Sequence, residues 1–207
     1  MPIAVPNAAL DALPVRRRAV DVLLLLAAIA AALLYLPLNH PRGAHIVQTA
    51  LDSHTPLVPV FAVPYLAFLP IFWLTLLAAL FTQRRYRAFV ITVIVVYCVS
   101  DVVYALYQTY VPRPSVEGGG PFNALVRFVY SNDHPYNDLP SEHASSATMF
   151  AAYLLAIGSR WRLAGCALAV GVVAATLLLH QHFIPGALAG VLLGALTSVI
   201  VYRRVRD

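Results

Sequence analysis

The stretch HFIPGALAGVLLGALTSVIVYRR occupies residues 182–204 and is the clearest indication of the architecture of this chain. Its apolar run, residues 184–202, has no charged side chain and matches the roughly 20 residues that a helix needs to cross a bilayer. Gly186, Gly190 and Gly194 recur at four-residue spacing, which places them on one helix face and permits close contact with another helix. A histidine precedes the run and two arginines follow it. The stretch therefore predicts a membrane-spanning helix whose two ends differ in chemistry.

Similar apolar runs fill most of the 207-residue chain, which is 60% hydrophobic and only 11% charged. Soluble domains carry about 25% charged residues, so this composition excludes a soluble fold. Six runs are long enough to be considered as spans: residues 19–38, 56–81, 88–111, 144–158, 161–179 and 184–202. The fourth run reaches bilayer length only if its helix begins near Pro140. We therefore expect an all-α, polytopic membrane protein, a six-transmembrane-helix bundle that forms one domain over residues 1–207.

Arginine is the only basic residue type besides histidine, and its distribution predicts the orientation of the bundle. Basic residues near span ends are retained on the cytoplasmic side. Eleven of the fourteen arginines would share that side: Arg16, Arg17, Arg18, Arg84, Arg85, Arg87, Arg160, Arg162, Arg203, Arg204 and Arg206. The other side keeps Arg42, Arg113 and Arg127. Both termini should therefore lie in the cytoplasm, with residues 1–18 as a cytoplasmic N-terminal segment.

The same topology places all seven histidines at the external face. The net charge of +5 would otherwise suggest a nucleic-acid partner, but the arginines lie between apolar runs and form no single patch. Cys98 and Cys166 both fall inside apolar runs and indicate no disulfide framework. The first apolar run is longer than the core of a typical secretory signal, which favours a retained anchor helix. We therefore expect an integral membrane protein with a histidine-rich outer end and no nucleic-acid partner.

Three polar clusters lie at the external ends of the predicted spans. Arg113 follows the third run, Ser141 and His143 precede the fourth, and His180 and His182 precede the sixth. Phosphoryl transfer without a metal needs fixed cations for the phosphate oxygens, a nucleophile and an acid for the leaving oxygen. Arginine binds phosphate through two parallel hydrogen bonds, and a helix start favours an anion. One histidine could attack while the other donates a proton, so these residues predict chemistry on a lipid phosphate.

These clusters carry a family resemblance. The strings YVPRP (110–114), FVYSND (128–133) and PYNDLPSEHASSAT (135–148) resemble signature motifs of the type 2 phosphatidic acid phosphatase superfamily. The segments LDSHTPLVPVFAVPYL (51–66) and HFIPGALAG (182–190) extend the likeness, which is closest to the inositolphosphotransferase-like branch. The resemblance implies a phosphohistidine mechanism without metal or organic cofactor. It implies His182 as the nucleophile, His143 as the acid, and Arg113 and Ser141 as phosphate-binding residues.

Two positions depart from the pattern that the resemblance implies. Gly186 stands where an aspartate would orient the nucleophilic histidine, and His180 stands where a basic residue would bind phosphate. Loss of the equivalent aspartate in a serine-type triad lowers turnover by about ten-thousand-fold. Asp101, an acid inside the third run, and Asp138 and Glu142, beside the fourth, are candidate replacements for the orienting carboxylate. The sequence leaves open which of them reaches His182.

Three functions remain open at this point. The first is a phosphatase or phosphotransferase that acts on a lipid phosphate or an isoprenyl diphosphate, with its active site on the outer face of a bacterial cytoplasmic membrane. The second is a catalytically silent relative that binds a lipid phosphate or a membrane partner, for which Gly186 is the main evidence. The third is a zinc site formed by His143, His180 and His182, because three imidazoles suit that metal.

Overall fold

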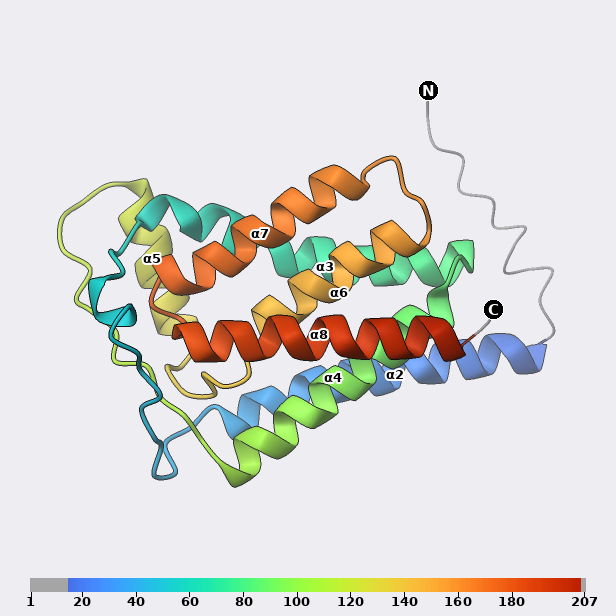
Figure 1. The fold of residues 1–207 in the computed structure, drawn as a ribbon, viewed down its shortest axis with the longest axis horizontal. Helices are drawn as coiled ribbons and strands as arrows, with labels where there is room; N and C mark the ends of the chain where they lie inside the picture. The colour runs from blue at the N-terminus through green and yellow to red at the C-terminus, as the bar shows by residue number, and fades with distance from the viewer. Residues whose placement is uncertain (1–14, 206–207) are drawn as a thin grey trace.

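A computed structural model describes residues 15–205, and within them it is helical without a β-strand (Figure 1). The long helices are α2 (Val15–Leu38), α3 (Ala62–Thr82), α4 (Tyr86–Leu106), α6 (Glu142–Ala156), α7 (Arg162–Leu178) and α8 (Ile184–Arg204). The shorter ones are η1 (Asp52–His54), η2 (Pro59–Phe61) and α5 (Pro121–Asn132). The all-α prediction is therefore confirmed for the described residues. Residues 1–14 of the predicted N-terminal segment lie outside them, and Arg16 to Arg18 belong to the start of α2.

Within residues 15–205, four helical segments are long and apolar enough to cross a membrane: Arg17–Leu38, Pro59–Thr82, Tyr86–Leu106 and Ile184–Arg204. They coincide with the predicted first, second, third and sixth spans. α7 is apolar but has 17 residues. α6 has 15 residues and would be about 22 Å long at the usual rise of 1.5 Å per residue. The helix begins at Glu142, two residues after Pro140, so the fourth and fifth spans stay predictions.

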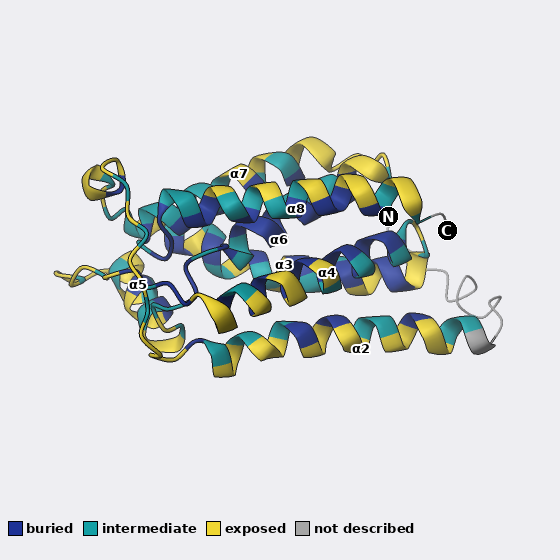
Figure 2. Cartoon of the chain, turned by 60° about the horizontal axis from the view of Figure 1, so that its bottom comes forward, coloured by how far each residue is buried: buried dark blue, intermediate teal, exposed yellow. Residues whose placement is uncertain are grey.

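The outer faces of the helices are apolar, as a bilayer requires. Leu188, Leu192 and Leu196 of α8 are 57%, 59% and 61% exposed, and Figure 2 shows exposed residues along the outer sides of α2, α7 and α8. Such an extended apolar surface is unusual for a protein in water. The interior of the bundle is filled by large buried rings and aliphatic side chains, among them Phe68, Phe72, Leu76, Tyr86 and Phe89. We conclude that the chain is an integral membrane protein.

The predicted glycine stripe of α8 packs against α6. A β-carbon on Gly190 would lie 2.3 Å from the carbonyl oxygen of Ser141, and one on Gly194 would lie 2.7 Å from that of Ser145. The start of α6 is fixed by Ser141, whose hydroxyl oxygen accepts a hydrogen bond from the amide of Ala144 at 3.2 Å. The backbone amide of Ser141 donates to the carbonyl of Gly186 at 2.9 Å. These contacts hold the beginnings of α6 and α8 side by side.

The helices run between two ends of the molecule that differ in chemistry (Figure 1). The α3–α4 and α6–α7 connections, the start of α2 and the end of α8 lie at one end, which carries the arginine-rich segments. An ion pair of 2.7 Å between Arg87 and Asp21 joins α4 to α2 there. The opposite end carries α5, the two short 3-10 helices and the segments that contain the histidines. The segregation of arginines from histidines that the sequence indicates is thus present in the fold.

Candidate active site

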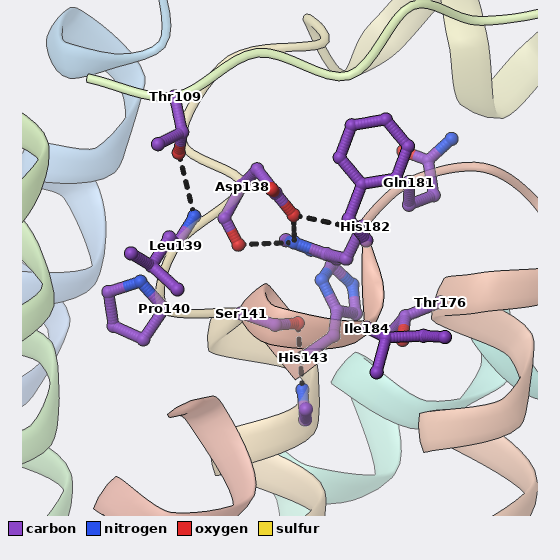
Figure 3. A network of polar contacts seen from close by, with 12 residues as sticks. Thr109, Asp138, Leu139, Pro140, Ser141, His143, Thr176, Gln181, His182 and Ile184 are labelled. Atoms are coloured by element: carbon purple, nitrogen blue, oxygen red, sulfur yellow. Dashed lines mark hydrogen bonds and ion pairs between the residues drawn. The ribbon is translucent and has the colours of Figure 1, made fainter. Parts of the chain in front are cut away.

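Hydrogen bonds between backbone segments bring the three predicted clusters together at the histidine-rich end. The amide of Val111 donates to the carbonyl of Pro135 at 2.9 Å, which joins the end of the α4 segment to the loop before α6. The amide of Leu139 donates to the hydroxyl of Thr109 at 2.8 Å (Figure 3). The contact between Ser141 and Gly186 joins the same loop to α8. Residues far apart in sequence therefore form one site.

The His182 side chain is held in one orientation by Asp138. His182 is 7% exposed, and its Nδ1 atom lies 2.8 Å from the carbonyl oxygen of Asp138 (Figure 3). Because a carbonyl oxygen can only accept, Nδ1 carries the hydrogen and donates it. The lone pair of the neutral ring then resides on Nε2. This arrangement suits a nucleophile that attacks through Nε2.

The carboxylate of Asp138 lies beside the same imidazole nitrogen. Its Oδ1 atom is 3.4 Å from Nδ1 of His182 and accepts a hydrogen bond from the amide of Phe183 at 2.9 Å. Asp138 is fully buried, and its Oδ2 atom has no hydrogen-bond partner within the described chain. Among residues 15–205 it is the carboxylate of Asp138, not of Asp101, that comes within 4.0 Å of His182.

Gly186 provides the space that the Asp138 side chain occupies. A β-carbon at position 186 would lie 2.4 Å from both the carbonyl oxygen and the Oδ1 atom of Asp138. Contacts this short do not occur between real side chains, so any larger residue would displace the loop that holds His182. The absence of a side chain at Gly186 therefore allows Asp138 to lie in its observed position.

Asp101, the other candidate for the orienting carboxylate, lies in α4. It is buried, and neither of its carboxylate oxygens has a hydrogen-bond partner among the described residues. The third candidate, Glu142, is the first residue of α6 and lies beside the cavity described below. The structure brings neither of these two side chains into an ion pair with His182.

His143 lies at the start of α6, next to His182. Figure 3 shows its ring extending from the helix toward that of His182, and the two imidazoles are close enough for their charges to interact. The His143 ring stacks on Tyr65 of α3 with a centroid distance of 4.2 Å and an interplanar angle of 17°. Its Nδ1 atom is 3.3 Å from the Tyr65 hydroxyl. This contact leaves Nε2 of His143 for a substrate.

Arg113 is held beside the segment that carries His182. Its guanidinium donates to the side-chain oxygen of Gln181 at 2.6 Å and to the carbonyl oxygen of Asp133, and it lies 4.8 Å above the ring of Tyr130. Burial raises the pKa of Tyr130 to about 12, although the nearby guanidinium opposes this shift. The neutral phenol donates to the carbonyl of Leu179 at 2.8 Å. Arg113 therefore joins the ends of α5 and α7 and provides a fixed positive charge near the site.

Ser141 and His180 are placed differently. The Ser141 amide is used by Gly186 and its hydroxyl oxygen by Ala144, so its hydroxyl hydrogen is the donor that remains for a phosphate. His180 hydrogen-bonds with the backbone of Thr55 and lies near Asp52. Burial lowers the pKa of His180 from its ordinary value, against the effects of these two neighbours. The contacts of His180 are thus with the η1 segment.

A cavity of about 330 Å³ opens beside His143. Its walls come mainly from α2, α3 and α5 and are largely apolar or aromatic, and they include Tyr35, Leu66, Leu69, Trp73 and Phe128. Asp133 and Glu142 supply the acidic part of the lining. No group of three or more histidine, cysteine or acidic side chains in the described chain is arranged to hold a metal ion. The zinc alternative therefore finds no ligand set there.

Four polar residues at the site were not predicted from the sequence. Tyr35 and Asn39 extend from the end of α2 and Tyr65 from α3, and all three contact Asp133 at the end of α5. Asp133 lies within a quoted motif, FVYSND, but nothing in that string points to contacts with residues 68 to 98 positions away. A polar residue near the end of an apolar run is the only available signal, and many such residues have no role in a site.

Comparison with known proteins adds one relationship. The chain matches the family model described as the PAP2 superfamily over residues 85–207, which is more than half of its length. The matched region includes Arg113, Asp138, His143 and His182, whereas α2 and α3 precede it. No curated protein and no solved structure matches the chain.

Proposed function

Because this chain belongs to the PAP2 superfamily, we propose that it is a metal-independent lipid phosphate phosphatase or phosphotransferase that works through a phosphohistidine intermediate. Superfamily members are generally phosphatases or phosphotransferases, and membership fits a role on lipid phosphates in the bilayer. The observation that carries the proposal is the contact of His182 with Asp138, beside His143. It supplies an oriented nucleophile, a carboxylate that stabilises its charge and a candidate acid.

The proposed reaction has two steps. Nε2 of His182 attacks phosphorus, the P–O bond to the leaving group breaks, and His143 gives its Nε2 proton to the leaving oxygen. Water or an acceptor alcohol then attacks the phosphohistidine, His143 takes the proton of the attacking group, and the N–P bond breaks. Arg113 and the Ser141 hydroxyl would stabilise the phosphate oxygens in both steps. Asp138 would stabilise the charged imidazole of His182 while the N–P bond exists.

Two features support a lipid as the substrate. The cavity beside His143 has mostly apolar walls, which suits the hydrocarbon part of a lipid phosphate or isoprenyl diphosphate. The surrounding helices present apolar outer faces to the bilayer.

We further propose one membrane domain of six spans, with both termini in the cytoplasm of a bacterial cell and the site at the outer face. The arginine-rich end opposite the histidines supports this orientation.

The catalytically silent alternative loses its main support. That alternative rests on Gly186, which stands where the family pattern has an aspartate. The carboxylate of Asp138, in the loop before α6, lies 3.4 Å from Nδ1 of His182, and this contact supports Asp138 as the replacement. The active enzyme is therefore the function we favour.

Purified protein in detergent tests the proposal directly. We expect phosphate release from short-chain phosphatidate or an isoprenyl diphosphate in the presence of EDTA, and loss of release in His182→Ala. His54→Ala is a matched control, because His54 is an exposed histidine at the same end of the molecule. Activity that disappears with EDTA, or equal activity in the wild type and His182→Ala, would contradict the mechanism. Absence of release from every lipid phosphate would contradict the function.

A further inference from the structure

The His143 imidazole is fixed by a tyrosine that comes from a different helix. Tyr65 is 4% exposed, stacks on the ring and places its hydroxyl 3.3 Å from Nδ1. Stacking determines the plane of the imidazole, and the hydroxyl contact determines its rotation within that plane. Together they select one orientation of a ring that would otherwise rotate about its side-chain bonds.

Asp133 extends this arrangement on the far side of Tyr65. The Tyr65 hydroxyl donates to Oδ2 of Asp133 at 3.4 Å, and Oδ1 accepts hydrogen bonds from the Tyr35 hydroxyl and the Asn39 amide, each at 2.8 Å. The Asp133 carboxylate therefore accepts hydrogen bonds from three side chains. Asn39 also donates to Tyr35 at 3.1 Å, so the end of α2 forms a continuous donor surface for Asp133.

We propose that Tyr65 and Asp133 are positioning residues for His143. Tyr35 of α2 and Asn39, which follows α2 directly, fix the Asp133 carboxylate. The inference rests on the proposed function, in which His143 protonates the leaving oxygen. Nδ1–H of His143 donates to the Tyr65 oxygen, and the Tyr65 hydroxyl donates to Asp133. This series of hydrogen bonds directs Nε2–H toward the substrate. When the ester bond breaks, the Nε2 proton moves to the leaving oxygen and the Nδ1 hydrogen stays in place.

The residues around His143 come from two parts of the sequence, one inside and one outside the region that matches the superfamily. The nucleophile, the acid and Arg113 lie within the region that matches the superfamily, residues 85–207. Tyr35 of α2, Asn39 directly after α2, and Tyr65 of α3 lie before it. The first two helices therefore contribute to proton transfer as well as to the bundle.

A comparison of two leaving groups tests the inference. Short-chain phosphatidate needs a proton on its alkoxide leaving group, whereas p-nitrophenyl phosphate releases a stable phenolate. In Tyr65→Phe and in Asp133→Asn we expect kcat for phosphatidate to fall by about tenfold with little change in KM, a fraction of the total effect of a general acid. The value of kcat/KM for p-nitrophenyl phosphate, which reports only the steps up to release of the leaving group, should fall by less than about threefold. The double variant should be little worse than either single variant, because both act through one chain.

Tyr107→Phe is the matched control, since Tyr107 stacks on His45 at the same end with a centroid distance of 4.6 Å. It should leave both rates unchanged. If Tyr65→Phe lowers both rates equally, or lowers neither, the inference is wrong while the proposed function stands. Should these variants not fold, Tyr35→Phe removes a single donor to Asp133 and should show the same selectivity to a smaller extent. A wild-type protein that releases phosphate from neither of these substrates nor from an isoprenyl diphosphate would overturn the proposed function itself.

Discussion

At the scale of single residues, the site depends on a steric match between Gly186 and Asp138. The Asp138 carbonyl and carboxylate both lie where a side chain at position 186 would have to go. The same carbonyl accepts the hydrogen bond from His182. Any residue larger than glycine would therefore disturb the carbonyl oxygen that accepts the hydrogen bond from His182. This explains why adding a carboxylate at position 186 should not improve the site.

We predict that substitution of either Asp138 or Gly186 lowers activity. Asp138→Asn keeps the backbone carbonyl but removes the charge beside His182, so kcat should fall on the order of a hundredfold, less than in a serine-type triad that loses its only orienting group. Gly186→Asp should also reduce kcat, because its β-carbon would collide with Asp138. Phosphate release from short-chain phosphatidate by purified variants measures both effects.

Glu117→Gln serves as the control for these variants, since Glu117 is an exposed acid in the loop after α4. It should retain full activity. A rise in activity in Gly186→Asp would instead favour the catalytically silent relative and would show that Asp138 does not act as the orienting carboxylate.

At the scale of elements, the α6–α8 contact determines whether the site can form. Ser141 caps the start of α6 and contacts Gly186 and Gly190 of α8, so the beginnings of the two helices form one packing interface, called the seam below. The seam was predictable in part, because four-residue glycine spacing indicates a packing face. The helix that packs against these glycines was not predictable, because the spacing of the glycines carries no information about their neighbour.

We predict that Gly190→Val destabilises the protein by about 1–3 kcal/mol through overpacking. The first added atom would lie 2.3 Å from the Ser141 carbonyl oxygen, which belongs to the backbone and cannot rotate away. Thermal unfolding in detergent measures the loss as a lower midpoint than that of the wild type.

Gly171→Val in α7 is the matched control, because a β-carbon at Gly171 would meet nothing within 4 Å. Its midpoint should stay close to that of the wild type. Equal midpoints for Gly190→Val and the wild type would mean that α6 and α8 do not pack as closely as described.

At the scale of the whole molecule, the sequence predicted the helical class and the meeting of three distant motifs. Apolar runs and the arrangement of arginines contain that information directly. The choice among Asp101, Asp138 and Glu142 could not be made, because it depends on the path of the loop before α6. The contact of Tyr65 with Asp133 joins residues 68 positions apart and follows from helix packing, which leaves no local pattern.

The proposed orientation predicts which loops are accessible from outside the cell. With Cys98 and Cys166 replaced by serine, a cysteine at Glu117 should react with a membrane-impermeant maleimide in intact cells. A cysteine at Ser159, between α6 and α7, should react only after the membrane is permeabilised. The reverse result would place the histidines on the cytoplasmic side and contradict the orientation.

The contact between Gly186 and Asp138 also affects how related sequences should be judged. A side chain at position 186 and that of Asp138, 48 positions apart in the sequence, would compete for the same space beside His182. A test that inspects position 186 alone would classify this chain as inactive. A criterion based on the distance from Nδ1 of His182 to the nearest acidic oxygen would not exclude this chain.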